Sequence, residues 1–394
     1  MSQKRPQSFD TRVVHAGEAP DPSTGAHGVP LYGSSTYAFR SYEQVEGFEA
    51  GQVPHFVYAR YGNPTVRCFE LKMADLEGAE AAAAAATGMA AIAATLTQVT
   101  AAGGHLIAAD ELYNVSGDFL CQDLPAQGVT VSRLDVRDLV AVEAAFTPQT
   151  RAIFVESLSN PRLKVADLGA LAEIAHGHGA LLIVDNTFLS PALLRPIEHG
   201  ADLVLHSATK YLSGTGQALG GVVAGRREVI GPIAARLARQ GGNMTPFAAW
   251  LLLIGIKTLP LRMERHSATT ARLAAFLAEH PAVATVNYPS LPGHPGADVV
   301  ARSTGERFGG VLSFTLKGGP VAARACLNAL QLCTIAVSLG DSSTLVWPFD
   351  SSGEGLIRVA VGLEDPADLE ADLAAGLDRA AQHAVARLPV SRAI

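Results

Sequence analysis

Two clusters of polar residues each follow an apolar segment of the chain. Asp185 ends one apolar run, and Ser207-Ala-Thr209-Lys210 follows the next one. Each cluster alone has an ordinary explanation, because aspartate commonly caps a turn and most lysines are solvated at the surface. Together the clusters supply a carboxylate, two hydroxyls that can hold a phosphate, and a lysine that can form a Schiff base when it is desolvated.

This combination meets the needs of pyridoxal 5′-phosphate (PLP). The cofactor requires a lysine for its aldehyde, an acid for its pyridine nitrogen and a cup for its phosphate. We therefore predict that Lys210 carries PLP as a Schiff base and that Asp185 holds the ring nitrogen. The run Gly214-Thr-Gly-Gln-Ala-Leu-Gly220 mimics a dinucleotide loop, but it lacks the G-x-G-x-x-G spacing and no early first strand precedes it, so a nicotinamide cofactor is not expected.

The elements that must position these clusters follow an α/β pattern. Short apolar runs predict buried strands at His105–Asp110, Val129–Asp135, Arg151–Glu156, Ala180–Asp185, Asp202–His206 and Leu219–Ala224. Helices are predicted at Asn63–Glu77, Gly88–Val99, Asp138–Phe146 and Asp167–His176, and the alanine run Ala81–Ala86 is also expected to be helical or tightly packed between helices. Apolar strands separated by helices indicate a mostly parallel sheet that is covered on both faces. Ligands of such sheets bind beyond the carboxyl ends of the strands.

The chain is expected to have three parts. Residues 1–52, which are rich in Gly, Pro and Ser, predict an extended N-terminal arm, and residues 53–245 predict the large PLP-binding domain. Residues 246–394 predict a smaller C-terminal α/β domain. Its expected elements are a long helix at Pro246–Leu277, strands at Ala284–Tyr288, Val311–Leu316 and Leu356–Val361, and a closing helix at Pro366–Val385.

The composition excludes several classes of function. The 394 residues are 48% hydrophobic, which allows a large core, and the net charge of −7 without charge blocks disfavours nucleic acid as a partner. The four cysteines lack metal-type spacing, so no metal site is expected. We find neither a secretory signal nor a run that would span a bilayer, and we expect a soluble cytoplasmic protein without a membrane partner.

The motif Ser207-Ala-Thr-Lys-Tyr-Leu-Ser-Gly214 resembles the lysine signature of the Cys/Met-metabolism PLP enzymes. This family includes the cystathionine synthases and lyases, methionine γ-lyase and the homoserine-ester sulfhydrylases. The resemblance runs from Phe9 to about Leu377 and includes, in the family's order, Tyr58-Ala-Arg60-Tyr-Gly-Asn63-Pro-Thr65, Thr87-Gly88-Met89, Glu156-Ser-Leu-Ser-Asn160-Pro161, Asp185-Asn-Thr-Phe188, Ser338-Leu-Gly340 and Ile357-Arg358-Val-Ala-Val-Gly-Leu-Glu-Asp365. It implies PLP fold type I, which is the fold of aspartate aminotransferase, and a homotetramer of two catalytic dimers.

The resemblance also implies a role for each matching position. The cofactor phosphate would be bound by backbone N–H groups, by hydroxyls and by two residues of the neighbouring subunit; these are Gly88 and Met89, Ser207 and Thr209, and Tyr58 and Arg60 respectively. Tyr113 would stack on the pyridine ring and act as an acid or base near the leaving group. The substrate site would contain Asn160, Ser338 and Arg358, with the arginine binding the substrate carboxylate. Asn160 would also bind the cofactor, near its phenolic oxygen. Lys210, once displaced by substrate, would move protons. Trp347 and His206 are expected to be packing residues.

The chain departs from the family pattern in segments that bear on the substrate. Gly214-Thr-Gly-Gln217 follows the lysine, Asn114-Val115-Ser116 follows Tyr113 where methionine γ-lyases have a cysteine at position 115, and Val346–Gly355 is a shortened loop. We expect the substrate mouth to be reshaped.

Four functions remain open on the sequence alone. They are γ-elimination from a homocysteine-, methionine- or homoserine-type amino acid, γ-replacement on an O-acyl homoserine, β-elimination from cystathionine or a cysteine conjugate, and non-catalytic binding of PLP or a partner. The retained lysine, aspartate, tyrosine and arginine argue against the last. Asn328–Leu332 and Ala336–Asp341 resemble the γ-lyase branch, whereas Pro246–Trp250 resembles sulfhydrylases. We favour γ-elimination, with room for an oxygen-linked leaving group such as that of canavanine.

Overall fold

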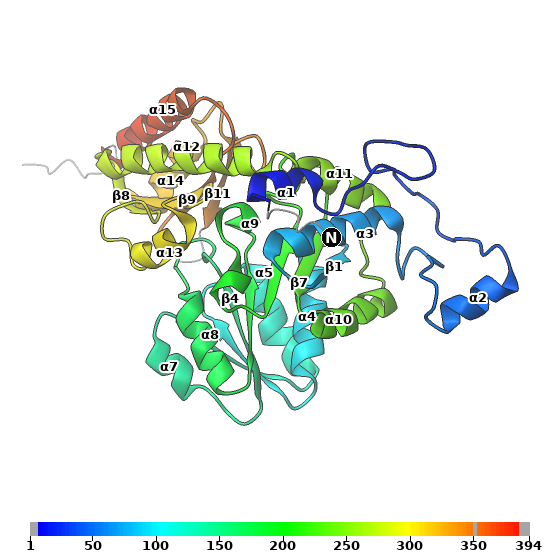
Figure 1. Ribbon diagram of the computed structural model, residues 1–394. Coiled ribbons are helices and arrows are strands. Elements are labelled where there is room, and N and C mark those ends of the chain that lie inside the picture. The colour runs from blue at the N-terminus through cyan, green and yellow to red at the C-terminus, as the bar shows by residue number, and fades with distance from the viewer. Residues whose placement is uncertain (1–6, 350–352, 386–394) are drawn as a thin grey trace, which may run out of the picture.

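A seven-stranded sheet forms the larger half of the protein (Figure 1). The computed structural model describes residues 7–349 and 353–385. The strand order is β1-β7-β6-β5-β4-β2-β3, and only β7 runs antiparallel to its neighbours. The sheet is therefore mostly parallel, as predicted. Its strands are β1 (Ala81–Ala85), β2 (His105–Ala109), β3 (Thr130–Leu134), β4 (Thr150–Glu156), β5 (Leu181–Asp185), β6 (Leu203–Ser207) and β7 (Gly221–Gly225).

Helices cover this sheet and lead to the smaller half. In the larger half and the segment before it they are α1 (Phe9–His15), α2 (Tyr42–Glu49), α3 (Pro64–Glu77), α4 (Gly88–Thr100), α5 (Asn114–Asp118), η1 (Phe119–Asp123), α6 (Leu124–Ala126), α7 (Leu139–Ala144), α8 (Leu168–Gly177), α9 (Ser190–Leu193), η2 (Pro196–His199) and α10 (Arg227–Gln240). Their starts follow ordinary capping chemistry. Asn63, for example, accepts hydrogen bonds from the backbone N–H groups of Thr65 and Val66, and Gly78 ends α3 in the left-handed conformation.

The alanine run is a strand, which corrects the helical prediction. Ala81–Ala85 pairs antiparallel with Gly221–Gly225 along its whole length, and all five alanines are buried. Helices α3 and α10 both pack on this strand, and its small side chains allow them to approach closely. Pairing with a distant strand therefore overrides the high helix propensity of alanine.

The predicted long helix at Pro246–Leu277 is two helices, α11 (Pro246–Ile256) and α12 (Leu259–Glu279), bent by 63° at their junction. Pro260 lies in the first turn of α12. A proline there removes a backbone donor and clashes with the preceding turn, so it ends a continuous helix. Within the described residues, no single helix has both the length and the apolar character to cross a membrane; only this bent pair passes that test when taken together.

A five-stranded sheet forms the smaller half, in the order β10-β11-β12-β9-β8. Its strands are β8 (Val283–Asn287), β9 (Val311–Leu316), β10 (Thr334–Ile335), β11 (Leu345–Phe349) and β12 (Leu356–Ala360), and its helices are α13 (Ala297–Thr304), α14 (Gly319–Leu327) and α15 (Pro366–Val385). Strand β11 was not predicted. It occupies the start of the segment expected to be a shortened loop, of which residues 350–352 lie outside the described residues.

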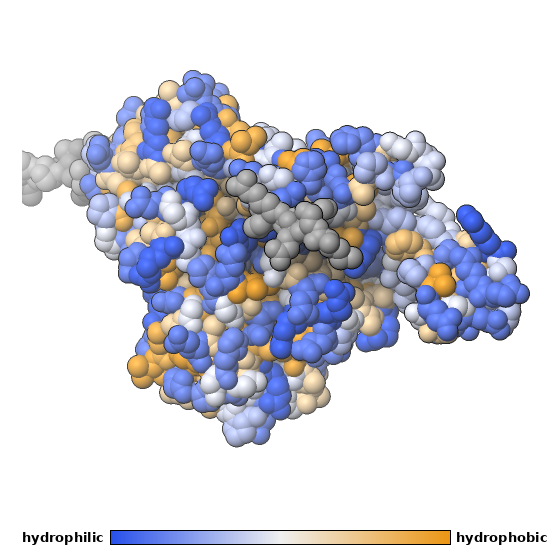
Figure 2. Space-filling view, viewed as in Figure 1, coloured by the Kyte–Doolittle hydropathy of each residue, from blue (hydrophilic) through white to orange (hydrophobic). Residues whose placement is uncertain are grey.

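The two sheets support the expected division into a large and a small domain. The boundaries at residues 52 and 245 remain proposals, and residues 1–6 and 386–394 of the outer parts lie outside the described residues. Polar and apolar residues are interspersed over the face drawn in Figure 2, as on most folded proteins.

Candidate active site

A cavity of about 580 Å³ lies beyond the carboxyl ends of β4, β5 and β6. The N-terminus of α4 forms one wall, and residues 337–339 with Trp347, Phe349 and Arg358 close it from the small-domain side. Ten of the predicted site residues line it together: Gly88, Met89, Tyr113, Asn160, Asp185, Ser207, Thr209, Lys210, Ser338 and Arg358. The structure thus brings residues from both sheets to one place, at the edge where a parallel sheet binds its ligands.

Asp185 ends β5 as a buried carboxylate. Its Oδ1 accepts hydrogen bonds from the backbone N–H (3.0 Å) and hydroxyl of Thr187, and the Thr187 hydroxyl oxygen in turn accepts one from the Ser207 N–H at 2.8 Å. The described residues offer no donor to Oδ2. Burial raises the pKa of Asp185, against the opposing effects of Thr187 and His206. A protonated ring nitrogen would supply the missing donor and a compensating charge.

Lys210 lies one turn beyond β6 and donates a hydrogen bond from Nζ to the Ser338 hydroxyl oxygen at 2.7 Å. Burial, and then the charge of Arg358, lowers the pKa of Lys210 to about 8. At pH 7 roughly one such lysine in ten is unprotonated, compared with roughly one in 3,000 at an ordinary lysine pKa. The amine is therefore available as a nucleophile near neutral pH.

Ser338 holds its position in a strained backbone conformation. Its φ of 89° falls in the region that favours glycine, which costs on the order of 1–3 kcal/mol. In this conformation its hydroxyl contacts Lys210 while its carbonyl oxygen accepts a hydrogen bond from Arg358 Nη2 at 2.7 Å. One residue thereby fixes the relative position of the lysine and the arginine.

The start of α4 forms a cradle for an anion. Thr87 caps the helix by accepting from the Ala90 N–H at 3.0 Å, and the N–H groups of Gly88 and Met89 have no protein acceptor among the described residues. A Cβ on Gly88 would lie 2.8 Å from the Ser207 Cβ, so only glycine lets the helix begin this close to Ser207. Free N–H groups, a helix dipole and a nearby hydroxyl fit a phosphate. Thr209, by contrast, bonds here to the backbone of Gly220.

Arg358 lies on β12 and is only 5% exposed. Besides its bond to Ser338, its Nη1 donates to Asn160 Oδ1 at 3.3 Å, and its buried Nε has no partner among the described residues. Burial lowers the pKa of Arg358 to about 10, which still leaves it charged at neutral pH. A buried guanidinium with an unused donor in a cavity is suited to a substrate carboxylate.

Glu156 is the main feature that the sequence analysis did not assign. It ends β4, and its two carboxylate oxygens accept from the N–H groups of Tyr113 (2.7 Å) and Asn160 (3.1 Å). Burial and the charge of Asp185 raise the pKa of Glu156 well above its ordinary value. The available signal was a carboxylate directly after an apolar strand, the same signal that identified Asp185.

Two residues expected to be packing residues behave differently. His206 is buried and contacts Glu77, with Nε2 2.5 Å from Oε1, so its interpretation as a packed strand residue is confirmed. Trp347, on β11, lines the cavity. Its interpretation as a packing residue was therefore incomplete, because the strand that carries it was not predicted.

Tyr58 and Arg60 do not line this cavity. Arg60 Nη1 donates to the Ala238 carbonyl oxygen at 3.2 Å, and the guanidinium lies over the rings of Tyr61 and Tyr58 at 4.7 and 5.5 Å. Both tyrosines are exposed. The role of Tyr58 and Arg60 at a neighbouring subunit's phosphate stays a prediction.

Comparison with known proteins gives a consistent result. The model of the Cys/Met metabolism PLP-dependent enzymes matches residues 10–378. The O-succinylhomoserine sulfhydrylase of Pseudomonas aeruginosa is 43% identical (94% of this chain and 95% of that protein), and the L-methionine γ-lyase of Pseudomonas putida is 41% identical (95% and 98%). A solved chain from Campylobacter jejuni that contains N′-pyridoxyl-lysine-5′-monophosphate superposes with a TM-score of 0.90 at 30% identity, covering 95% of this chain and all of that one.

Proposed function

Because the chain belongs to the Cys/Met metabolism PLP-dependent enzymes, we propose that it removes the γ-substituent of an L-amino acid of the homocysteine, methionine or homoserine type. As a member of this family it is a PLP-dependent lyase or transferase. The products of γ-elimination are a 2-oxo acid, ammonia and the released γ-group.

The proposed choice of substrate rests on the residues that line the cavity. Leu219 and Val337, which are 65% and 61% exposed, line the cavity, as does Trp347. The charged side chains lining the cavity are Glu156, Asp185, Lys210 and Arg358 alone among the described residues. Each of these four side chains either already bonds to a neighbouring residue or would be needed by the α-carboxylate or the cofactor. None of them would be left to pair with a charged γ-substituent. An uncharged γ-substituent, such as a thioether, therefore fits better than a guanidino-oxy or succinyl group.

The protein residues would divide the chemistry as follows. Bound PLP supplies an aldehyde for the substrate amine and a ring that stabilises negative charge at Cα and Cβ. Arg358 would bind the α-carboxylate and so fix the orientation of the Cα–H bond that is broken. Lys210 Nζ would take the proton from Cα, pass it to the cofactor, and then take a second proton from Cβ.

Asp185 and Tyr113 would support this proton transfer in two ways, Asp185 at the ring nitrogen and Tyr113 at the leaving group. Asp185 holds a proton on the ring nitrogen, since an anion beside it favours the charged form. The Tyr113 side chain is exposed to the cavity while its backbone N–H is fixed by Glu156. Its hydroxyl can thus donate a proton to the leaving group.

The second candidate is γ-replacement, and the 43% identity to a sulfhydrylase favours it. Both reactions need the same residues up to departure of the γ-group. They differ only in whether an external thiol or sulfide then adds to the substrate.

A substrate panel tests the proposal. L-Methionine, O-acyl homoserines, cystathionine and canavanine would be incubated with the holoenzyme in deuterated water, with and without sulfide, beside Lys210→Ala as the inactive control. We expect 2-oxobutanoate bearing deuterium at Cβ from uncharged γ-substituted substrates. Homocysteine formed only with sulfide would favour replacement, and pyruvate as the main product would refute γ-elimination.

We further propose that two chains share each site, within a cytoplasmic homotetramer of two catalytic dimers. The support is that Tyr58 and Arg60 lie away from their own chain's cavity while matching the family's phosphate-binding motif. The subunit-exchange experiment described in the Discussion tests this arrangement.

A further inference from the structure

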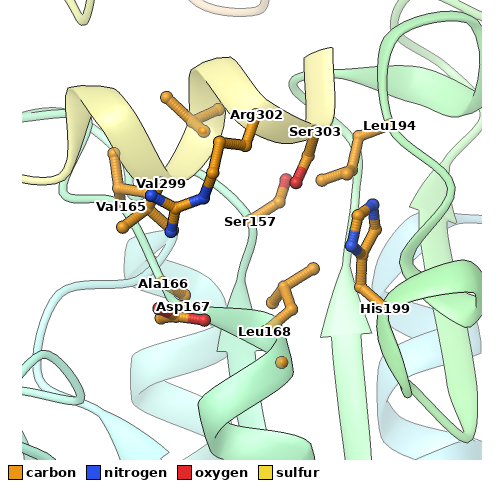
Figure 3. Close-up of a pocket in the computed structure, with 12 residues that line it drawn as sticks. Ser157, Val165, Ala166, Asp167, Leu168, Leu194, His199, Val299, Arg302 and Ser303 are labelled. Carbon is orange, nitrogen blue, oxygen red and sulfur yellow. The ribbon is translucent and has the colours of Figure 1, made fainter.

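A second cavity, of about 200 Å³, lies where the small-domain helix α13 faces the large domain (Figure 3). Arg302 and Ser303 enter it from α13, and Ser157, Leu168 and His199 enter it from the other side. None of its lining residues lines the active-site cavity. Its volume is below the range typical of drug-sized ligands, so any ligand must be small.

A buried hydroxyl without a partner points into this cavity. Ser157 is 3% exposed, and its Oγ makes no hydrogen bond within the described residues. Figure 3 shows the side chains of Ser157 and Ser303 both extending into the middle of the cavity. A buried polar group that lacks a partner is unfavourable, so a ligand that supplies one gains binding free energy here.

Opposite charges flank the hydroxyls. Arg302 lines the rim of the cavity; its side chain is 66% exposed, and its Nη1 lies 3.2 Å from Asp298 Oδ2, its described ion-pair partner. Asp167 caps α8 through Oδ1, which accepts from the Ala170 N–H at 3.2 Å, and no described residue donates to its Oδ2. The imidazole of His199 lies on the wall opposite Arg302.

The remaining walls are apolar. They consist of Val165, Ala166, Leu168, Leu194, Val299 and Val300. The cavity thus combines a cation, an anion, two hydroxyls and an aliphatic surface around a small volume. These features match one chemical class, an α-amino acid with a short aliphatic side chain. Its carboxylate would meet Arg302, its ammonium group Asp167 and its side chain the aliphatic wall.

We propose that this cavity binds a free aliphatic α-amino acid that regulates the active site. Two features connect the sites. The ligand would contact Ser157, the residue after Glu156, whose carboxylate holds the backbone of both Tyr113 and Asn160. The ligand would also contact both α13 of the small domain and α8 of the large domain. Binding would therefore stabilise the domain arrangement in which these contacts are best. The coupling is thus a differential affinity for two arrangements of the active site.

The test separates this cavity from the catalytic one. Borohydride-reduced holoenzyme, in which PLP is fixed to Lys210, would be titrated with L-leucine by calorimetry. L-Leucine has no γ-leaving group and cannot be turned over. We expect wild type to bind L-leucine at one saturable site. Arg302→Gln should lose affinity roughly tenfold or more, because a charged hydrogen bond is lost. Val299→Phe should show a comparable loss, because it fills the cavity without removing a charge.

Asp298→Asn is the matched control, because it removes the external partner of Arg302 but does not line the cavity. The affinity of the Asp298→Asn variant for L-leucine should stay within about twofold of that of wild type. In the unreduced enzyme L-leucine should change kcat, and Arg302→Gln should keep its basal kcat while losing that response. The proposal is overturned if wild type binds no L-leucine at about 10 mM, if Arg302→Gln binds as wild type does, or if binding disappears in Arg358→Lys instead. Because binding is measured without turnover, these outcomes do not depend on which reaction the enzyme catalyses.

Discussion

Replacing Arg358 by lysine should separate substrate binding from cofactor binding. The arginine donates to the Ser338 carbonyl oxygen and to Asn160 Oδ1, and no residue in the described part of the chain pairs with its Nε. Lysine keeps the positive charge but replaces the planar fork by a single ammonium group. It can satisfy the protein partners or the substrate carboxylate, but not all of them at once.

The magnitude follows from the bonds that are lost. One hydrogen bond to a charged group contributes about 1.5–3 kcal/mol, which corresponds to a loss of roughly 10- to 150-fold in kcat/KM. Disturbance of Ser338, which also binds Lys210, adds to this loss. The phosphate cradle at Gly88 is formed by other elements, so PLP content should be unchanged.

Steady-state kinetics and the visible spectrum of the bound cofactor measure the two effects separately. Arg272→Lys is a matched control, since Arg272 is also a two-pronged arginine of the C-terminal part, bound to Glu370 at the surface. It should retain wild-type kinetics. A change of less than threefold in kcat/KM for Arg358→Lys, with PLP fully bound, would refute the assignment of the carboxylate site.

Three further predictions concern the cofactor. The purified protein should be yellow, and borohydride should fix PLP to Lys210; a peptide map with PLP on another lysine would contradict this. Because the unprotonated amine reacts and the pKa of Lys210 is lowered to about 8, PLP uptake by the apoenzyme should rise with pH and level off above about 8, whereas a continued rise toward pH 10.5 would indicate a solvated lysine. Mixing Arg60→Ala and Lys210→Ala subunits should restore activity, since one hybrid site is intact; no recovery despite proven subunit exchange would count against shared sites.

The sequence could predict the parts of the site that rest on local patterns. Asp185 and Lys210 follow adjacent apolar strands, and the carboxyl ends of parallel strands meet at one sheet edge, so their proximity follows from the pattern alone. The closing helix at Pro366–Val385 was predicted with the bounds it has in the structure. In each case the information lies within one short segment.

Features that depend on distant segments could not be predicted. The strand at Ala81–Ala85 exists because residues 221–225 pair with it, and nothing near the alanines encodes that pairing. The function of Glu156 depends on Tyr113 and Asn160, which reach its carboxylate from before and after its strand. The cavity at Ser157 is likewise formed only when α13 meets α8.

The pairing of β1 with β7 also constrains when the protein can become functional during its synthesis. The cradle at Gly88 needs Ser207 beside it, β1 needs residues up to Gly225, and the carboxylate site needs Arg358. A nascent chain therefore carries an unpaired alanine strand until most of the large domain has left the ribosome. Such long-range pairing is slow to form and exposes strand edges in the meantime. A ligand that binds only the native state stabilises that state, so we expect PLP to bind late in folding, after these distant segments have come together.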